Sequence, residues 1–291
     1  MNESINSCNL CGGNKQKILF HENVGDSGDA FTIMKCLDCG LVFTSPQPSD
    51  DFLEKLYSKE SYASDSMSGH YCLDAELGQV DHLRVLSMLT GLTKGKRLLD
   101  VGCGTGIFVK RALEDGWDAF GNEPSSYAEA TIGKELEDRI QFDYLSECNY
   151  ETESFDVVSL WYVLEHVTNP NMVLSEATKL TKNGGLVFIA VPNWNYIALR
   201  RLLAASLGKQ STVHAHEHLY QYTPKTIEKY LKKSGFEIEV KMMASPFYIS
   251  GGMVNLLKKI ASVFVVILWR LTGISLGGIM IIAKKTSHRN C

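Results

Sequence analysis

An alternation of short apolar runs with segments of helical periodicity, between residues 97 and 191, constrains the fold of this chain more than any other feature. The runs are typical of β-strands, and the segments between them repeat apolar residues at helical spacing. Strands that alternate with helices in this way form a parallel sheet covered on both faces, so we predict a doubly wound α/β fold. The predicted strands are Arg97–Val101, Trp117–Asn122, Phe155–Leu160 and Leu186–Val191, and the predicted helices are Ile107–Asp115, Ser125–Leu136 and Asn171–Thr181.

After Pro192 the alternation becomes less regular. Thr223 and Pro224 form the start signal of a further helix, and Gly235 gives its stop signal. Residues 236–242 and 278–284 have the pattern of two late strands.

A glycine-rich turn joins the first predicted strand to the first predicted helix. Residues 102–106 read Gly-Cys-Gly-Thr-Gly, and glycines at alternate positions permit positive φ angles and let a ligand lie against the backbone. This spacing differs from the G-x-G-x-x-G spacing that seats a pyrophosphate. Asp100, just before the turn, would repel a phosphate but suits the amino group of an aminoacyl ligand. About twenty residues further on, Glu123 follows the second strand, where a carboxylate can accept hydrogen bonds from both hydroxyls of a ribose.

From Lys96 to Asn193 these motifs resemble, in order, those of the class I S-adenosylmethionine-dependent methyltransferases. Leu98–Gly106 resembles their motif I, and Ser154–Val158 resembles their fourth-strand motif. The resemblance implies a Rossmann-like, mostly parallel seven-stranded sheet with S-adenosylmethionine as cofactor. The cofactor-binding residues that it implies are Asp100, Gly102, Gly104, Gly106, Glu123 and, near the adenine amine, Asp143.

Four of the eight cysteines form two C-x-x-C pairs near the N-terminus. Cys8 with Cys11, and Cys36 with Cys39, can each supply half of a tetrahedral site, and four thiolates complete the shell of a structural zinc ion. A catalytic zinc is not expected, because no coordination position stays open. Two redox pairs, or free thiols in the core, are the alternatives. Cys103 in the glycine turn is expected to fill space beside the ligand rather than to act as a catalytic thiol.

Residues 213–218, Val-His-Ala-His-Glu-His, form the richest cluster of titratable side chains in the chain. The cluster follows the fifth strand, on the side where an α/β sheet binds ligands, and histidine can take up a proton near neutral pH. It can be a substrate loop that carries a base, a solvated loop, or a second metal site that includes His216 and His218. The stretch resembles the His-Glu-His of zinc-containing sugar C-methyltransferases, which implies His218 as the catalytic base and Glu217 as its helper. His166, after the fourth strand, is the other catalytic candidate.

The predicted domains follow from these patterns. Residues 1–45 form a zinc-binding ribbon, residues 46–95 a linker and helical cap, and residues 96–291 the methyltransferase domain. Within that domain we predict a substrate loop at residues 194–222 and an apolar helical insertion at residues 250–272.

The linker carries two predicted helices, at residues 50–57 and 74–92, around a polar, serine-rich stretch. In the family that the core resembles, this segment folds over the substrate. Its tyrosines are therefore candidates for substrate contact: Tyr57, Tyr62 and Tyr71.

Charge and hydropathy exclude several classes of protein. The net charge is −4, whereas a dedicated nucleic-acid binder carries a basic excess, so DNA is not expected as a partner. Residues 1–8 lack the apolar run of a secretory signal, so we expect a cytoplasmic protein with reduced cysteines. Ile260–Trp269 is an apolar run within residues 256–271, but it is too short to span a membrane, and a longer span would bury Arg270. This stretch is expected to pack in the core, to form a homodimer interface in place of a monomer, or to lie on the inner face of the membrane.

These patterns predict an enzyme that transfers a methyl group from S-adenosylmethionine to a small molecule or glycan, at a sugar hydroxyl or carbon. The apolar stretch at residues 256–271 would suit a lipid-linked acceptor. An RNA methyltransferase with a zinc recognition module is one alternative, which the acidic balance disfavours. A non-catalytic docking protein is another, which the intact glycine turn and Glu123 disfavour.

Overall fold

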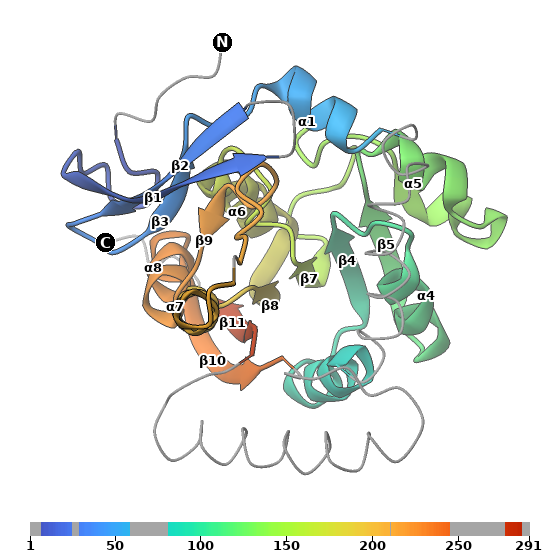
Figure 1. Cartoon of the computed structure of the whole chain (residues 1–291). Coiled ribbons are helices and arrows are strands. Elements are labelled where there is room, and N and C mark those ends of the chain that lie inside the picture. The colour runs from blue at the N-terminus through green and yellow to red at the C-terminus, as the bar shows by residue number, and fades with distance from the viewer. Residues whose placement is uncertain (1–6, 25–28, 59–80, 210, 245–276, 287–291) are drawn as a thin grey trace, which may run out of the picture.

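A computed structural model of the chain describes residues 7–24, 29–58, 81–209, 211–244 and 277–286. These residues form two β-sheets, one of seven strands and one of four, with helices around the larger sheet (Figure 1). The helices are α1 (Asp50–Leu56), α4 (Ile107–Glu114), α5 (Ser126–Thr131), α6 (Pro170–Leu180), α7 (Trp194–Ser206) and α8 (Pro224–Lys233), and residues 81–92 are also helical.

The larger sheet confirms the prediction of a doubly wound, mostly parallel seven-stranded fold. Its strands are β4 (Arg97–Val101), β5 (Asp118–Asn122), β6 (Ile140–Gln141), β7 (Phe155–Trp161), β8 (Thr181–Val191), β10 (Phe236–Met243) and β11 (Ile279–Lys285). Their order across the sheet is β10-β11-β8-β7-β4-β5-β6. The neighbours from β8 to β6 are parallel, whereas β11 pairs antiparallel with both β8 and β10 at one edge.

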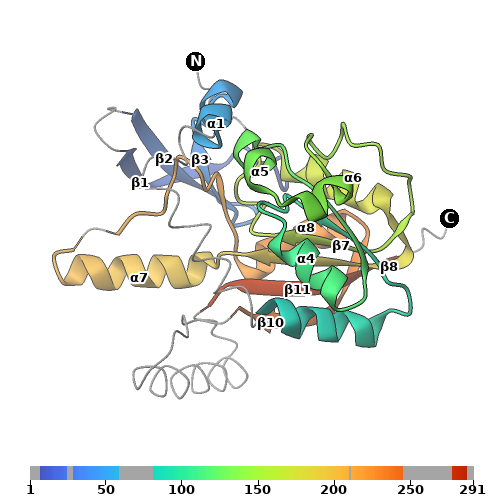
Figure 2. The ribbon, with the colours of Figure 1, turned by 90° about the vertical axis from the view of Figure 1, so that its right-hand side faces the viewer.

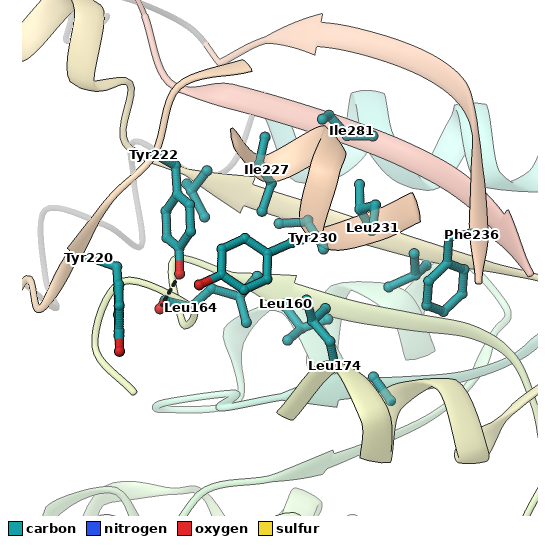
Figure 3. Close-up of a cluster of buried hydrophobic side chains, with 14 of the residues drawn as sticks. Leu160, Leu164, Leu174, Tyr220, Tyr222, Ile227, Tyr230, Leu231, Phe236 and Ile281 are labelled. Carbon is teal, nitrogen blue, oxygen red and sulfur yellow. Dashed lines mark hydrogen bonds between the residues drawn. The ribbon is translucent and has the colours of Figure 1, made fainter. Parts of the chain in front are cut away.

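Two hydrophobic cores lie on the two faces of this sheet. Because neighbouring residues of a strand point to opposite faces, Leu99 lies in one core and Leu98 in the other. α6 and α8 contribute to the first core, and α4 with residues 81–92 contributes to the second. Figure 3 shows the first core, where Tyr222 and Tyr230 lie among leucines.

The smaller sheet joins the N-terminal residues to a segment much later in the chain. It consists of β1 (Gln16–Val24), β2 (Asp29–Cys36), β3 (Val42–Ser45) and β9 (Tyr220–Gln221), in that order. All its neighbours are antiparallel, and β9 pairs with β3 through Val42 with Gln221 and Phe43 with Tyr220. The predicted ribbon therefore shares a sheet with the predicted substrate loop.

Two segments differ from their predicted secondary structure. The single helix predicted over residues 125–136 is divided into α5 and a 3-10 helix, Lys134–Arg139, because Ile132 is extended and Gly133 is a poor helix former. The predicted substrate loop begins with α7, a helix with no buried residue. Figure 2 shows α7 extending away from the larger sheet, alongside the smaller one.

Within the described ranges, no helix is long and apolar enough to cross a lipid bilayer. The predicted insertion at residues 250–272, with its apolar stretch, lies outside these ranges, as do Tyr62 and Tyr71.

Candidate functional site

The glycine turn lies at the carboxyl end of β4, where α4 begins. Gly102, Gly104 and Gly106 all have positive φ angles, of 63°, 55° and 75°. A side chain would also lack room: a Cβ atom on Gly102 would lie 2.8 Å from Val163 Cγ2, and one on Gly106 would lie 2.7 Å from Leu136 Cδ1. The positive φ angles at all three positions therefore favour glycine, and any Cβ atom at Gly102 or Gly106 would displace a neighbouring side chain.

Glu123 follows β5 and closes the other side of this turn. Its Oε2 accepts a hydrogen bond from Gly104 N at 2.9 Å, and its Oε1 accepts one from Ser125 N at 3.0 Å. The residue is only 8% exposed, and burial raises the pKa of its carboxyl group although both hydrogen bonds lower it. Each oxygen keeps a further lone pair, so the carboxylate can still accept from ribose hydroxyls.

Asp100 lies deeper than its predicted role suggests. It is 2% exposed, and Ser159 Oγ donates a hydrogen bond to its Oδ1 at 2.7 Å. Burial, with a smaller contribution from the charge of Glu123, raises the pKa of Asp100 to about 8. A positive ligand group nearby would stabilise its charged form.

The two remaining residues of this region have contrasting environments. Asp143 is exposed, and its backbone carbonyl accepts a hydrogen bond from Asn122 Nδ2 at 3.1 Å, which places it beside the end of β5. Cys103 is buried against Gly121, and burial raises the pKa of its thiol well above the ordinary value. Such a thiol is a poor nucleophile, because the thiolate is the reactive form.

The four N-terminal cysteines converge. Their Sγ atoms all lie within 4.8 Å of one another, with Cys8 and Cys39 3.5 Å apart and Cys11 and Cys36 3.6 Å apart. Tetrahedral zinc with Zn–S bonds of about 2.3 Å requires sulfur atoms roughly 3.8 Å apart. The donor set and its spacing therefore fit a closed tetrahedral thiolate site.

The two cysteine knuckles have the same backbone geometry. Gly12 N donates to Cys8 O and Gly40 N donates to Cys36 O, and both glycines have positive φ angles. Further contacts anchor the first knuckle to the larger sheet's helices. The Oδ1 atom of Asn9 accepts hydrogen bonds from Tyr230 Oη of α8 and from Asn171 Nδ2 of α6.

Lysines of α8 also face these knuckles. Lys233 Nζ donates to Leu10 O at 3.2 Å, and Lys229 Nζ donates to Cys39 O at 3.4 Å. A zinc ion with four thiolates carries a net negative charge, which two nearby ammonium groups would offset.

A chain of contacts links the cofactor side to the histidines. Ser125 Oγ donates to Tyr57 O at 2.9 Å, and Tyr57 Oη lies 2.8 Å from His166 Nδ1. The His166 ring packs edge-on against the His218 ring, with centroids 4.8 Å apart. Tyr222 Oη donates to Leu164 O (Figure 3), which fixes the backbone just before His166. The two predicted catalytic histidines, His166 and His218, therefore lie together. Tyr57 and Ser125 connect them to the cofactor side of the fold.

The histidine segment is a tight turn. Glu217 N and His218 N both donate to His214 O, and His214 has a positive φ angle of 56°. Glu217 Oε1 lies 3.2 Å from His214 Nδ1, so the partner of Glu217 in this structure is His214, not the predicted His218. Although burial opposes ionisation, the His214 hydrogen bond and the neighbouring imidazoles lower the pKa of Glu217 to about 2.

Burial controls the protonation of the paired histidines. It lowers the pKa of His166 to about 4, and together with the neighbouring His166 it lowers that of His218 to about 3. The pKa of His214 is raised instead, chiefly by the hydrogen bond to Glu217. His166 and His218 are therefore neutral at neutral pH, and an unprotonated ring nitrogen of each can accept a hydrogen bond.

Potential ligand atoms of Glu165, His166 and His218 lie within 4.8 Å of one another. The predicted second metal site paired His218 with His216, and His216 does not belong to this group. Three ligand atoms at such distances would suit a divalent ion that prefers nitrogen and oxygen.

A pocket of about 310 Å³ opens beside the histidine turn. Its wall comes from the ends of β7 and β8, the start of α7, the histidine turn and the residues before β11. Tyr162 lines the pocket, and the next residue, Val163, contacts the glycine turn. The pocket therefore lies next to the cofactor loop. It is lined by Tyr162, Pro192, Asn193, Tyr196, Ile197, Arg200, Thr212, Val213, His214, His218, Gly277 and Gly278.

Sequence reasoning missed several of these lining residues. Tyr196, Ile197 and Arg200 belong to α7, which lacks a buried stripe and so gives no helical signal. Tyr162 has a positive φ angle of 55°, a strained conformation for a large side chain that only the structure reveals.

The sequence matches the methyltransferase domain family over residues 79–240, which include the glycine turn, Glu123 and the histidine turn. It is 31% identical over 176 residues to the ubiquinone biosynthesis O-methyltransferase of Aliivibrio fischeri (strain MJ11), covering 55% of this chain and 73% of that protein. It is 30% identical over 155 residues to the protein of the same name from Azoarcus sp. (strain BH72), covering 50% and 65%.

Two solved structures share the fold. The Burkholderia thailandensis 1,6-didemethyltoxoflavin-N1-methyltransferase, with its substrate and S-adenosylhomocysteine bound, superposes with a TM-score of 0.56 at 15% identity, covering 91% of this chain and 99% of that one. The magnesium protoporphyrin IX methyltransferase of Synechocystis PCC 6803, with S-adenosylhomocysteine bound, gives 0.53 at 14% identity, covering 78% and 98%.

Proposed function

We propose that this chain, a member of the methyltransferase domain family and an S-adenosylmethionine-dependent methyltransferase, methylates a small molecule. The acceptor is held in the pocket beside the histidine turn. One observation carries this proposal. The pocket wall includes both Tyr162, whose neighbour Val163 contacts the glycine turn, and His218, which packs on His166. An acceptor in this pocket would therefore lie between the cofactor loop and a candidate base.

S-adenosylmethionine, when bound, supplies the electrophilic methyl group. The glycine turn offers its backbone to the cofactor, Glu123 accepts from the ribose hydroxyls, and Asp100 balances positive charge from beneath the turn. Asp143, exposed beside the end of β5, is proposed to contact the adenine. Alignment of donor and acceptor supplies much of the rate in a displacement of this kind.

His218 is the proposed base. A neutral imidazole on the pocket wall can accept the proton that an acceptor hydroxyl or acidic carbon gives up as the methyl group arrives. His166 packs against it and is itself fixed by Tyr57, so the pair is held in place from the cofactor side. Glu217 acts on this wall through His214.

The acceptor is proposed to be a small molecule with a hydroxyl group, sugars included. The O-methylation named for the relatives supports an oxygen acceptor. The mixture of tyrosines with Asn193, Thr212 and Arg200 in the pocket supports an acceptor with both a ring face and hydrogen-bonding groups. Lipid-linked glycans remain within this proposal.

The cysteine cluster is proposed to hold one structural zinc ion through Cys8, Cys11, Cys36 and Cys39. The four thiolates leave no position for substrate, so the ion would stabilise the N-terminal sheet and take no part in methyl transfer. Elemental analysis of protein purified without chelator should find one zinc per chain, and metal-free protein with unchanged folding would refute the assignment.

The function is tested by assaying methyl transfer in parallel to phenols, nucleotide sugars, lipid-linked sugars and RNA. We expect turnover with one class of small molecule and none with RNA. Wild-type and Tyr162→Ala proteins should be compared, because Tyr162 lines the pocket and the variant should lose acceptor affinity while it retains S-adenosylmethionine. Turnover of RNA alone would overturn the proposal.

A further inference from the structure

One of the contacts between the N-terminal sheet and the histidine turn is made by a buried carboxylate. Glu22 of β1 accepts hydrogen bonds from Val213 N at 2.8 Å and from Ala215 N at 2.9 Å. These two amides lie on either side of His214, and Glu22 is buried with them. Glu22 therefore holds the backbone of the pocket wall on both sides of His214, and Gln221 of β9 holds it at the carbonyl groups of Val213 and His218.

The backbone between those two amides is strained. A left-handed conformation costs a residue with a Cβ atom about 1–2 kcal/mol, and it persists only where the surroundings determine it. His214 has such a conformation, and so does Tyr162 on the same pocket. The two hydrogen bonds to Glu22 are among the contacts that hold this conformation, together with those of Gln221 to Val213 O and of Glu217 to His214.

Glu22 has a second partner that ties it to α7. Arg201 Nη1 lies 3.9 Å from Glu22 Oε2, and its guanidinium stacks over the Phe20 ring at 3.7 Å. Arg201 also donates to Ser211 O, close to the start of the histidine turn. The side chain of Glu22 therefore meets two backbone amides and a guanidinium.

We propose that the N-terminal sheet is part of the acceptor site, and that Glu22 is the positioning residue through which the sheet fixes the pocket wall at His214. The inference rests on the proposed function, since it assigns the sheet to the same pocket. Glu22 does not touch the acceptor. It acts by holding Val213, His214 and Ala215 in place.

The test uses Glu22→Gln, which keeps the shape of the side chain but replaces one acceptor oxygen with an NH₂ group. One of the two amides then faces a donor, so the anchor is lost on that side. We expect the KM for the acceptor to rise about 10- to 100-fold, with kcat and S-adenosylmethionine affinity changed much less. Glu176→Gln is the matched control, because it removes the same charge from a surface pair with Lys179.

Amide hydrogen exchange supplies a readout that needs no acceptor. Exchange at Val213 and Ala215 should accelerate in Glu22→Gln, while exchange in β4 and β7 stays as in the wild type. If the wild-type protein methylates no acceptor, the proposed function fails, but this exchange measurement still tests Glu22. Unchanged exchange at both amides together with an unchanged acceptor KM would overturn the inference.

Discussion

Asp100 and Glu123 are both buried carboxylates beside the glycine turn, but they are held differently. Glu123 accepts two backbone hydrogen bonds, whereas Asp100 accepts a hydroxyl hydrogen bond from Ser159. The pKa of Asp100 is raised from 3.8 to about 8, mainly by burial. A raised carboxyl pKa favours the protonated folded form, so the cofactor-free protein should lose stability as pH rises from about 4 towards 8.

Cofactor binding should therefore release protons near neutral pH. The sulfonium and ammonium groups of S-adenosylmethionine favour the charged form of Asp100 and so lower its pKa. Titration calorimetry in two buffers with different ionisation enthalpies should give different binding heats at about pH 7.5. In Asp100→Asn the heats should converge. Heats that are independent of the buffer in the wild type would contradict this assignment.

Replacement of the proposed base should affect turnover rather than cofactor binding. A positioned base contributes about 10²–10⁴-fold, so His218→Asn should reduce kcat by that factor. Because the pKa of His218 is lowered to about 3, the rate should show no acid limb near the ordinary histidine value of 6.5. His216→Asn is the matched control, since His216 does not line the pocket. Full turnover in His218→Asn would exclude it as the base.

Among the elements of the fold, one of the two shortest strands makes the connection between the two sheets. β9 has two residues, yet it completes the N-terminal sheet and is continuous with the histidine turn before it and the cap of α8 after it. Thr44 N of β3 donates to Leu219 O, which extends the pairing by one residue. α8 then returns to the first cysteine knuckle through Tyr230. Two consecutive elements, β9 and α8, thus both bind the N-terminal residues.

Removal of the Tyr230 hydroxyl group should weaken this connection. Its hydrogen bond to Asn9 is partly buried, so Tyr230→Phe should lower the free energy of unfolding by about 1 kcal/mol. Urea denaturation measures the change. Tyr144→Phe, at an exposed position, should leave the unfolding free energy within about 0.5 kcal/mol of the wild type. Equal stability of the wild type and Tyr230→Phe would show that the knuckle does not depend on this contact.

In the whole molecule, the N-terminal residues that carry the four cysteines share a hydrophobic core with the larger sheet. Cys8, Cys36 and Phe43 belong to the same buried cluster as Leu160 of β7 and Tyr230 of α8. A separate cluster around Ile33 and Val42 of the smaller sheet likewise includes Val213 and Ala215 of the histidine turn. Loss of the proposed zinc ion should therefore loosen the pocket wall, through β9 and Glu22, more than it disturbs the glycine turn.

Chelation of the proposed zinc should separate the two binding functions. In metal-free protein the affinity for the acceptor should fall about tenfold or more, because the anchors of the histidine turn are loosened. The affinity for S-adenosylmethionine should stay close to that of the holo protein. Calorimetry with each ligand before and after chelation measures both, and readdition of zinc should restore acceptor binding. An equal loss of both affinities would contradict this division.

The sequence predicts the larger sheet well because its strands and helices have strong periodicity. β4 is predicted with its observed bounds, and the glycine turn and Glu123 occupy the expected ends of β4 and β5. The convergence of the cysteines is likewise predictable, because the C-x-x-C pairs are short-range signals. These features depend on local patterns.

Long-range features were not predictable in the same way. The pairing of β3 with β9 and the contact of Glu22 with Val213 join residues whose local sequence shows no sign of the partner. Glu217 pairs with His214 rather than with the predicted His218, within a turn in which His214 has a left-handed backbone conformation. No pattern within the single sequence identifies these contacts, because each depends on how the two sheets pack.

The order of synthesis gives the strand pairing a further consequence. Thr44 and the carbonyl of His218 are 174 residues apart along the chain, yet they are in contact in the folded protein. During translation the free edge of β3, with Val42 and Phe43, emerges from the ribosome long before β9 exists to cover it. An uncovered strand edge with apolar side chains is prone to pair with other chains. The nascent protein therefore has a period of exposure to aggregation that ends only when residues 220–221 have been made, and chaperone demand should concentrate in that interval.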